Sequence, residues 1–224
     1  MLLEVCAGNY QSAINAQHAG AHRIELCKDL DLDGLTPDRD IIKKVLHAVS
    51  LPVYVLIRPR AGNFVYSDAE FETMHQDIQF SKSAGCHGIV SGILNSDGTI
   101  DRARTSMLVE LSKPLPFTFH RAFDQTSDPL QAMEELAGIG IERVLTSGQE
   151  KNAINGIELL SHLKASVTRC PIIIPGAGIS AKNATVFMEN GFIEIHASAR
   201  SGNTSEGHYS DPEIIRAILK AISP

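Results

Sequence analysis

Two cysteines near the amino terminus have the spacing of a soft-metal site. Cys6 and Cys27 each end a short β-rich run, Leu2–Cys6 and Arg23–Cys27. If these runs are neighbouring strands, which lie about 4.8 Å apart, the two thiols converge at matching strand ends. Soft thiolates select Cu(I), so the pair is a candidate Cu(I) site. Two small buried thiols that only pack against each other are the alternative.

A second group of side chains could bind an anion or move protons. Arg58 and His120 each end a β-rich run, Glu25 lies two residues before Cys27, and Asp124 lies in the loop after His120. An imidazole titrates near neutral pH, and a guanidinium matches the oxygens of a phosphate or a carboxylate. The four residues His120, Glu25, Arg58 and Asp124 are therefore candidate catalytic residues. In this hypothesis, His120 is a general acid/base on a small phosphorylated or carboxylated substrate.

The segment 58–66 has the composition of a lid or an anion clamp. It contains Arg58 and Arg60, two aromatic residues, and Gly62 as a candidate hinge. Arginine forks bind carboxylate or phosphate groups through two parallel hydrogen bonds, which makes Arg60 a candidate anion-binding residue. A rigid loop with solvated arginines is the alternative.

Glycines and a serine mark a second candidate anion site. Gly176 and Gly178 lie where the run Ile172–Gly176 ends, and Ser198 ends the run Ile193–Ser198. Barrel enzymes frequently bind phosphate through backbone N–H groups of the last two strand-to-helix loops. We therefore expect an anion at the amides of residues 176–179 and 198–199. The glycines alone are a weak signal, because turns between strand and helix need glycine anyway.

The elements that must position these residues alternate along the whole chain. The predicted strands are Leu2–Cys6, Arg23–Cys27, Val53–Arg58, Gly88–Ser91, Phe117–His120, Arg143–Ser147, Ile172–Gly176 and Ile193–Ser198. The predicted helices are Asn9–Ala19, Asp38–Ala48, Ser67–Ala84, Asp101–Leu111, Asp128–Ala137, Asn152–Lys164, Ser180–Glu189 and Asp211–Ala221. This α/β pattern over residues 1–224 most simply closes into one domain, a (β/α)8 TIM barrel. An open doubly wound sheet is the alternative.

Alternation within the strands predicts a charged barrel interior. Positions expected to face the helices are apolar, namely Leu3, Val5, Ile24, Leu26, Val53, Val55, Ile57, Phe117, Phe119, Val144, Ile193 and Ile195. Positions expected to face inward are mostly polar, namely Glu4, Cys6, Arg23, Glu25, Cys27, Tyr54, Arg58, Thr118, His120, Arg143, Glu194, His196 and Ser198. An open parallel sheet buried on both faces would instead read as continuous apolar runs. The acids and arginines below the mouth either pair as a satisfied core or serve a ligand.

Local signals support the element boundaries. Glycines precede every second strand at positions suited to a left-handed helix end, namely Gly20, Gly85, Gly140 and Gly191. Ser67 and Glu70 have the spacing of a capping box. Thr36 before Pro37 predicts a helix cap followed by a proline at the first helical position.

Composition excludes several classes of function. Lys and Arg number 20 against 26 Asp and Glu, and the net charge of −6 has no basic stripe, so nucleic acid is not an expected partner. The longest apolar runs are far short of the roughly 20 residues that span a bilayer, so no membrane contact is expected. The residues after Met1 do not form a secretory signal, and four cysteines without a CxxC pair are expected to be reduced thiols of a cytosolic chain. Cys86 and Cys170 precede strands and are expected at the opposite end of the barrel.

Seven short motifs together resemble the CutC copper homeostasis family. They are Leu3-Glu-Val-Cys6, Arg23-Ile-Glu-Leu-Cys27, Gly34-Leu-Thr-Pro37, Ile57-Arg-Pro-Arg60, Phe117-Thr-Phe-His-Arg-Ala-Phe-Asp124, Arg143-Val-Leu-Thr-Ser-Gly-Gln149 and His196-Ala-Ser-Ala199. The resemblance runs from residue 2 to about 200. It implies a TIM barrel, a cytoplasmic location, a homo-oligomer, and a Cu(I) role with ligands at Cys6 and Cys27. Departures from the family pattern fall in three loops, at residues 7–9, residues 61–63 and Ser91.

The thiols are expected to stay protonated until a metal binds. A free cysteine has a pKa of about 8.5, and Glu4 and Glu25 lie two residues before the two cysteines, where their carboxylates oppose ionisation. Arg58 on the next strand favours it. We therefore expect Cu(I) binding to release protons and to weaken as the pH falls. Three hypotheses remain open: a copper homeostasis protein, an enzyme on a small anionic ligand, and an inactive barrel whose mouth is fully salt-bridged.

Overall fold

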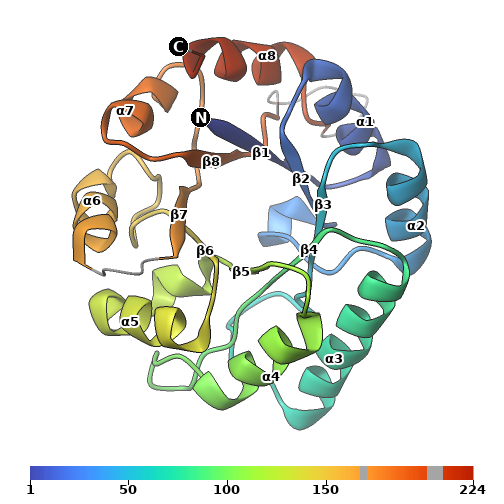
Figure 1. The fold of residues 1–224 in the computed structure, drawn as a ribbon, viewed down its shortest axis with the longest axis vertical. Helices are drawn as coiled ribbons and strands as arrows, with labels where there is room; N and C mark the ends of the chain where they lie inside the picture. The colour runs from blue at the N-terminus through green and yellow to red at the C-terminus, as the bar shows by residue number, and fades with distance from the viewer. Residues whose placement is uncertain (167–170, 201–208, 224) are drawn as a thin grey trace.

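Eight parallel strands form a nearly closed barrel at the centre of the computed structural model, which describes residues 1–166, 171–200 and 209–223 (Figure 1). The strands are β1 Leu2–Ala7, β2 Arg23–Leu26, β3 Val53–Leu56, β4 Gly88–Ser91, β5 Phe117–Phe119, β6 Arg143–Thr146, β7 Ile172–Pro175 and β8 Glu194–Ala197. Ladders join the order β7-β6-β5-β4-β3-β2-β1-β8. Strands β7 and β8 lie next to each other without a ladder between them. The predicted (β/α)8 TIM barrel is confirmed.

The helices form the outer ring of the molecule (Figure 1). They are α1 Tyr10–Ala19, α2 Arg39–Ala48, α3 Asp68–Ser83, α4 Arg102–Ser112, α5 Pro129–Ile139, α6 Ile157–Ser166, α7 Ala184–Glu189 and α8 Pro212–Ala221. Two short 3-10 helices, η1 Leu30–Leu32 and η2 Arg121–Gln125, follow β2 and β5 and were not expected from the sequence. Among the described residues, we find no helix with the length and apolar character needed to cross a membrane.

The predicted alternation within the strands is confirmed at nearly every position. Leu3, Val5 and Ile24 belong to the large apolar core between strands and helices and are fully buried. Cys6, Cys27, Tyr54, Leu56 and Val90 form a separate cluster, as expected for side chains on the inner face.

Ile193 is the exception among the apolar positions. It precedes β8 and is 60% exposed, so the expectation that it lies under a helix is wrong. The strand begins one residue later than the sequence predicts, and Ile193 is left at the rim of the barrel.

The helix signals are mostly correct. Ser67 and Glu70 form the predicted capping box at the start of α3, and the glycine that ends α1, Gly20, has a φ of 88°. The expected cap at Thr36 is wrong, because α2 begins after Asp38. The Thr36 hydroxyl instead accepts a hydrogen bond from the backbone N–H of Arg58 at 2.8 Å and so joins two loops at the mouth.

Two predicted helices are shorter than the sequence suggested. Helix α6 begins at Ile157 because residues 152–156 form a turn, in which Gly156 lies against Gly148 with no room for a side chain. Helix α7 begins at Ala184, after a turn in which the Asn183 side chain accepts from the backbone of Ser180.

The two remaining cysteines were both predicted to lie at the opposite end of the barrel from the mouth. Cys86 is buried just before β4, which agrees with that prediction. Cys170 lies outside the described residues.

Candidate functional site

A cavity of about 300 Å³ lies at the carboxyl ends of the barrel strands. The predicted site residues that line it are Cys6, Glu25, Arg58, His120, Asp124, Gly178 and Ser198. Arg60, Gly176 and Cys27 are not part of its wall. The structure therefore brings seven of the ten predicted site residues together at one mouth, as the barrel architecture leads one to expect.

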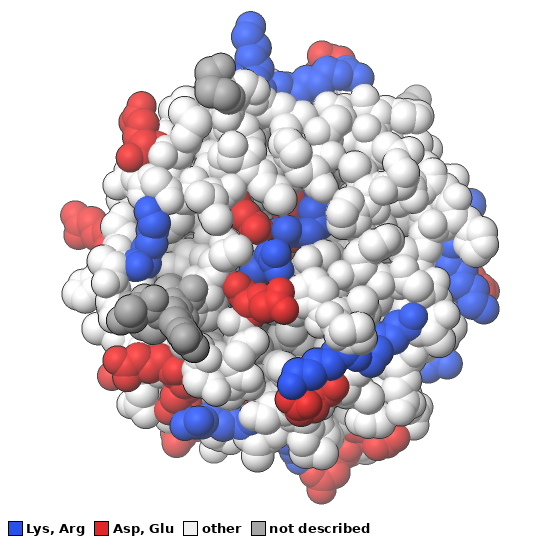
Figure 2. Space-filling view, viewed as in Figure 1, with Lys and Arg blue, Asp and Glu red and all other residues white. Residues whose placement is uncertain are grey.

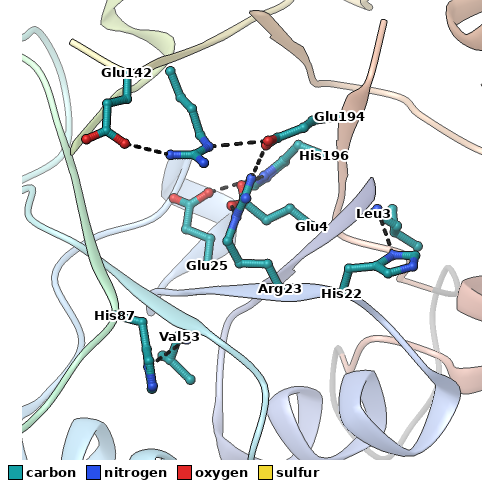
Figure 3. Close-up of polar contacts among 11 residues, drawn as sticks. Leu3, Glu4, His22, Arg23, Glu25, Val53, His87, Glu142, Glu194 and His196 are labelled. Carbon is teal, nitrogen blue, oxygen red and sulfur yellow. Dashed lines mark hydrogen bonds and ion pairs between the residues drawn. The ribbon is translucent and has the colours of Figure 1, made fainter. Parts of the chain in front are cut away.

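Below the cavity, a network of buried ion pairs fills the barrel interior (Figure 3). Arg23 donates to both Glu4 and Glu194, and Arg143 Nε lies 3.4 Å from Glu194 Oε1. Burial alone would raise the pKa of Glu4, but the hydrogen bond from His196 and the charge of Arg23 lower it to about 2. Acidic and basic side chains also meet at the centre of the ring in Figure 2. This lower layer is a satisfied ionic core.

Glu25 is a buried carboxylate beside this network, and it contacts the network through His196 (Figure 3). Its Oε2 atom has no hydrogen-bond partner among the described residues. The Nδ1 atom of His196 lies 3.3 Å from it but donates to Glu4 Oε1, at 2.8 Å. Burial raises the pKa of Glu25 to about 7, partly opposed by the nearby charge of His196. Glu25 thus presents an unsatisfied acceptor at the cavity wall.

The two cysteines converge as predicted. Their sulfur atoms lie 3.5 Å apart, and both thiols are buried, with Cys6 on the cavity wall. Hydrogen bonding to Cys27, burial and the charge of Glu25 raise the pKa of Cys6 well above its ordinary value. The raised pKa of Cys6 agrees with the expected protonated thiol, and its largest cause is the neighbouring thiol rather than a carboxylate.

His196 completes a cluster of candidate metal ligands. One donor atom each from Cys6, Glu25 and His196 lie within 4.8 Å of one another. Burial would lower the pKa of His196, but the charge of Glu25 and hydrogen bonds with Cys6 and Glu4 raise it well above its ordinary value. Because Glu4 holds Nδ1, the ring orientation is fixed, and the other nitrogen can bind a metal ion once it loses its proton.

Arg58 is buried, and it contacts backbone oxygens, the Tyr66 side chain and the ring of Phe64. Its Nη1 atom donates to the carbonyl oxygens of Leu32 at 2.7 Å and Gly34 at 2.9 Å, and Nη2 donates to Gly62 at 3.0 Å. Its Nε has no partner, and no carboxylate of the described residues pairs with it. Arg58 therefore fastens the loops after β2 and β3 together and carries an unneutralised charge beside the cavity.

His120 is a buried, neutral imidazole at the end of β5. Its Nδ1 accepts the backbone N–H of Ala122 at 3.1 Å, which places the ring proton on Nε2, and Nε2 has no partner within the described part of the chain. Burial and the charge of Arg58 lower the pKa of His120 to about 3. The ring of Phe64 lies 4.9 Å from it, between centroids. His120 is thus suited to donate a hydrogen bond from Nε2 rather than to exchange protons at neutral pH.

Asp124 is fully occupied in holding the loop after β6. Its carboxylate accepts from the hydroxyls of Thr146 and Ser147, from the backbone of Ser147 and Gln149, and from Arg121 Nε at 2.9 Å. Asp124 lines the cavity, but its oxygens already have these partners. The arrangement positions the loop that carries Arg121 against the next one.

The loop after β7 offers free backbone donors. The N–H groups of Ala177, Gly178 and Ile179 have no hydrogen-bond partner in the described residues, and all three residues line the cavity. The expectation for Gly176 is wrong in detail, because its N–H donates to the Thr146 carbonyl at 3.0 Å. Gly176 is needed for packing instead, since a Cβ there would lie 2.6 Å from Leu145 Cδ1.

Arg60 does not reach the cavity. Its guanidinium donates to Glu70 at 2.5 Å and to the backbone oxygens of Asn63 at 2.9 Å and Val65 at 2.6 Å. These bonds close the segment 58–66 on itself at the surface. Arg60 is therefore a structural residue of the loop in this structure.

Sequence reasoning missed two contributors to the site. His196 was placed inside the barrel but not among the metal ligands, although its position opposite Glu4 in the β1–β8 register was a usable signal. Phe64 was recognised only as an aromatic of its loop, and nothing in the sequence placed it between Arg58 and His120. The free amides of Ala177 and Ile179 were not missed, since both lie in the segment 176–179 where the sequence predicts an anion.

Comparison with known proteins gives one consistent result. The model of the CutC family matches residues 1–201. The chain is 45% identical over 205 residues to the copper homeostasis protein cutC homolog of Mus musculus, covering 91% of this chain and 75% of the relative. It is 44% identical to the human homolog over the same shares. A crystal structure of a copper homeostasis protein CutC from Streptococcus agalactiae superposes with a TM-score of 0.83 at 32% identity, covering 88% of this chain and 98% of that chain.

Proposed function

Because the chain belongs to the CutC family, we propose that it takes part in copper homeostasis by binding Cu(I) through the thiols of Cys6 and Cys27. The observation that carries this proposal is the pair of sulfur atoms 3.5 Å apart at the barrel mouth. Soft thiolates prefer Cu(I) over the hard cations that carboxylates bind, so the donor set fits the ion. The ion can reach the thiols through the cavity, because Cys6 is part of the cavity wall.

The distance between the thiols favours a bent arrangement with a third ligand. With metal–sulfur bonds of about 2.3 Å, as in zinc thiolates, a linear arrangement needs sulfur atoms about 4.6 Å apart. At 3.5 Å the two sulfurs instead enclose an angle of about 100° at a shared ion. A bent pair leaves a further position open, and His196 lies within 4.8 Å of the Cys6 donor atom.

His196 is the better third ligand of the two available. Imidazole suits copper, whereas carboxylates suit hard cations such as Mg²⁺ and Ca²⁺. Glu4 holds the ring through Nδ1, which is the usual way in which an outer carboxylate orients a metal-binding histidine. Glu25 then lies beside the ion as a neighbouring charge rather than as its ligand.

Competition for Cu(I) against a chelator tests the proposal. Reduced wild-type protein is compared with Cys6→Ser, Cys27→Ser and His196→Asn, and Cys86→Ser serves as the matched control because Cys86 is equally buried but lies at the other end of the barrel. Loss of either thiol should weaken Cu(I) binding by more than the about 10–100-fold typical of outer-shell substitutions. His196→Asn should weaken it by about tenfold or more.

The control and the contrary outcome are clear. Cys86→Ser should bind Cu(I) as tightly as the wild type. Unchanged affinity in both Cys6→Ser and Cys27→Ser would remove the copper site, and an equal loss in Cys86→Ser would show that the thiols act only through folding.

A further inference from the structure

Three buried polar atoms without partners belong to residues that line one cavity. Glu25 Oε2, Arg58 Nε and His120 Nε2 have no hydrogen bond within the described residues, and all three residues form part of the wall at the barrel mouth. Buried polar groups in folded proteins nearly always have a partner. Three exceptions around one space indicate that a ligand supplies the partners.

Arg58 makes its part of the wall favourable for an anion, whereas the side chains of Asp33 and Glu25 elsewhere on the wall are acidic. Arg58 is 3% exposed, and its partners are neutral: carbonyl oxygens, the Tyr66 side chain and the ring of Phe64. Its positive charge has no carboxylate within salt-bridge distance among the described residues. A buried cation without a counter-ion is unfavourable. Two other arginines of the wall are already paired, Arg121 with Asp124 and Arg200 with Asp31. The uncompensated charge is therefore that of Arg58.

A second place for oxyanion oxygens lies on another part of the rim. The free N–H groups of Ala177, Gly178 and Ile179 follow β7, which three strands separate from β3 in the ladder order. Consecutive backbone N–H groups form concave sites for phosphate and carboxylate oxygens. The cavity thus has donors at two separate places, with the Glu25 acceptor as a third polar contact.

We propose that the mouth cavity binds a small organic oxyanion, a phosphomonoester or a carboxylate, that carries acceptor groups at both ends and a hydroxyl group. One end lies on the amides of Ala177–Ile179, the other accepts from His120 Nε2 beside Arg58, and the hydroxyl donates to Glu25. The volume of about 300 Å³ is at the lower end of the range for small-molecule sites, about 300–1,000 Å³, so the ligand has only a few carbon atoms.

The proposed copper site does not account for Arg58 and His120. Its ligands lie on β1, β2 and β8, whereas Arg58 and His120 lie at the ends of β3 and β5. An arginine and the protonated nitrogen of a neutral imidazole are hydrogen-bond donors and cannot bind a metal ion. The oxyanion is therefore a second ligand of the same mouth, and its binding is separable from that of Cu(I).

His120 is built as a donor rather than as a titrating group. Its Nδ1 is committed to the backbone of Ala122, and Gly92 leaves it just enough room, since a Cβ there would lie 2.7 Å from Nδ1. The ring is therefore fixed with Nε2 as its free corner. His120→Asn keeps an acceptor for the Ala122 N–H and removes the Nε2 donor, which makes it a selective test.

Calorimetric titration with three probes tests the proposal: inorganic phosphate, glycolate and 2-phosphoglycolate. Inorganic phosphate reports the amides alone, and glycolate reports the carboxylate end together with the hydroxyl contact to Glu25. 2-Phosphoglycolate, which has no hydroxyl group, reports both ends without the Glu25 contact. We expect 2-phosphoglycolate to bind most tightly, with about tenfold loss or more in His120→Asn and in Arg58→Met. Arg60→Met is the matched control, because Arg60 lies two residues away and carries the same charge outside the cavity. Cys27→Ser, which lacks the copper thiol but leaves the wall intact, should bind 2-phosphoglycolate like the wild type.

The outcomes separate the possibilities. A crystal soaked with 2-phosphoglycolate should show its phosphate on the amides of Ala177–Ile179. The proposal is overturned if no probe binds the wild type, if His120→Asn binds all probes unchanged, or if Arg60→Met loses as much affinity as Arg58→Met. Should Arg58→Met fail to fold, the His120→Asn titration and the crystal decide. Loss of Cu(I) binding in Cys27→Ser with 2-phosphoglycolate binding intact would support two independent ligands.

Discussion

The two layers of the barrel interior contain the same types of charged residue but differ in whether these residues are paired. In the lower layer, Arg23 bridges Glu4 and Glu194, and Arg143 adds to Glu194, so each charge has a partner. In the layer at the mouth, Glu25 and Arg58 are equally buried, yet neither makes a hydrogen bond to a charged side chain among the described residues. Glu25 has only His196 Nδ1 nearby, at 3.3 Å, and Arg58 has no carboxylate within salt-bridge distance in that part of the chain. Burial alone therefore does not distinguish the two layers. Pairing does.

This contrast in pairing indicates that the lower layer stabilises the fold and that the layer at the mouth binds ligands. A buried ion pair that is complete is close to neutral for stability, whereas one that has lost a partner is strongly destabilising. The lower layer is complete before any ligand arrives. The mouth is incomplete, so it gives up stability that a copper ion or an oxyanion can restore.

The largest expected effect comes from breaking the lower layer. Arg23→Met leaves Glu4 and Glu194 buried without their shared cation, and the free energy of unfolding should fall by about 3–5 kcal/mol. Denaturant unfolding measures the loss. Arg216→Met is the control, because Arg216 pairs with Glu213 at the surface of α8, where such a pair contributes less than about 1 kcal/mol. Equal effects of the two variants would contradict the view that the lower layer holds the barrel together.

The same Glu→Gln substitution at one carboxylate of each layer, Glu4 and Glu25, compares the two layers directly. Glu4→Gln loses the charge that Arg23 and His196 both bind, which should lower the unfolding free energy by about 1.5–3 kcal/mol. Glu25→Gln removes a charge whose Oε2 accepts no hydrogen bond, so the change should stay below about 1 kcal/mol or be a gain. Denaturant unfolding at pH 7 measures both, and a larger loss in Glu25→Gln would reverse the assignment of the layers.

How far the sequence could predict this division depends on the residue. Period-two alternation correctly placed Glu4, Arg23, Glu25 and His196 inside the barrel, because one buried face repeats every second residue. It left open whether the acids and arginines pair, since pairing depends on how the strands are staggered. In the structure Glu4 stands level with Arg23 and Leu2 with Glu194, which lets one guanidinium reach both carboxylates.

At the mouth, the site could not be predicted fully from the sequence, because it depends on loop conformations. Arg58 and Arg60 lie two residues apart and have the same chemistry, yet only Arg58 lines the cavity. The choice is made by carbonyl oxygens of Leu32, Gly34 and Gly62, which come from two different loops and leave no mark in the sequence. For the same reason, the amide of Gly176 was expected to be free but bonds to Thr146.

Two glycines, one in β4 and one in the loop after it, allow a test of which layer binds the ligand, with smaller expected changes in stability. A Cβ at Gly88 would lie 2.7 Å from the ring of Tyr54 in the lower layer, and one at Gly92 would lie 2.7 Å from His120 at the mouth. Gly88→Ala and Gly92→Ala should each lower the unfolding free energy by about 1–3 kcal/mol through overpacking. Only Gly92→Ala should also weaken binding of 2-phosphoglycolate, measured by calorimetry. If only Gly88→Ala weakened the binding, the ligand would lie in the lower layer, which contradicts the proposed site at the mouth.

The smallest expected effect is a difference in how stability depends on pH. Burial and the charge of Arg58 hold the pKa of His120 at about 3, below the usual value of about 6.5, so the unfolded chain binds more protons in this range. The stability that the neutral ring contributes is fully present above pH 6.5 and falls as the pH drops toward 3, by at most about 1.4 kcal/mol per pH unit.

His120→Asn lacks this titration, so the stability difference between wild type and variant should shrink between pH 7 and pH 5. Taking the difference cancels the titration of Glu25 and the other shared groups. Urea unfolding at several pH values measures it, and parallel curves for the two proteins would show that His120 titrates normally in the folded state and is no fixed donor at the mouth.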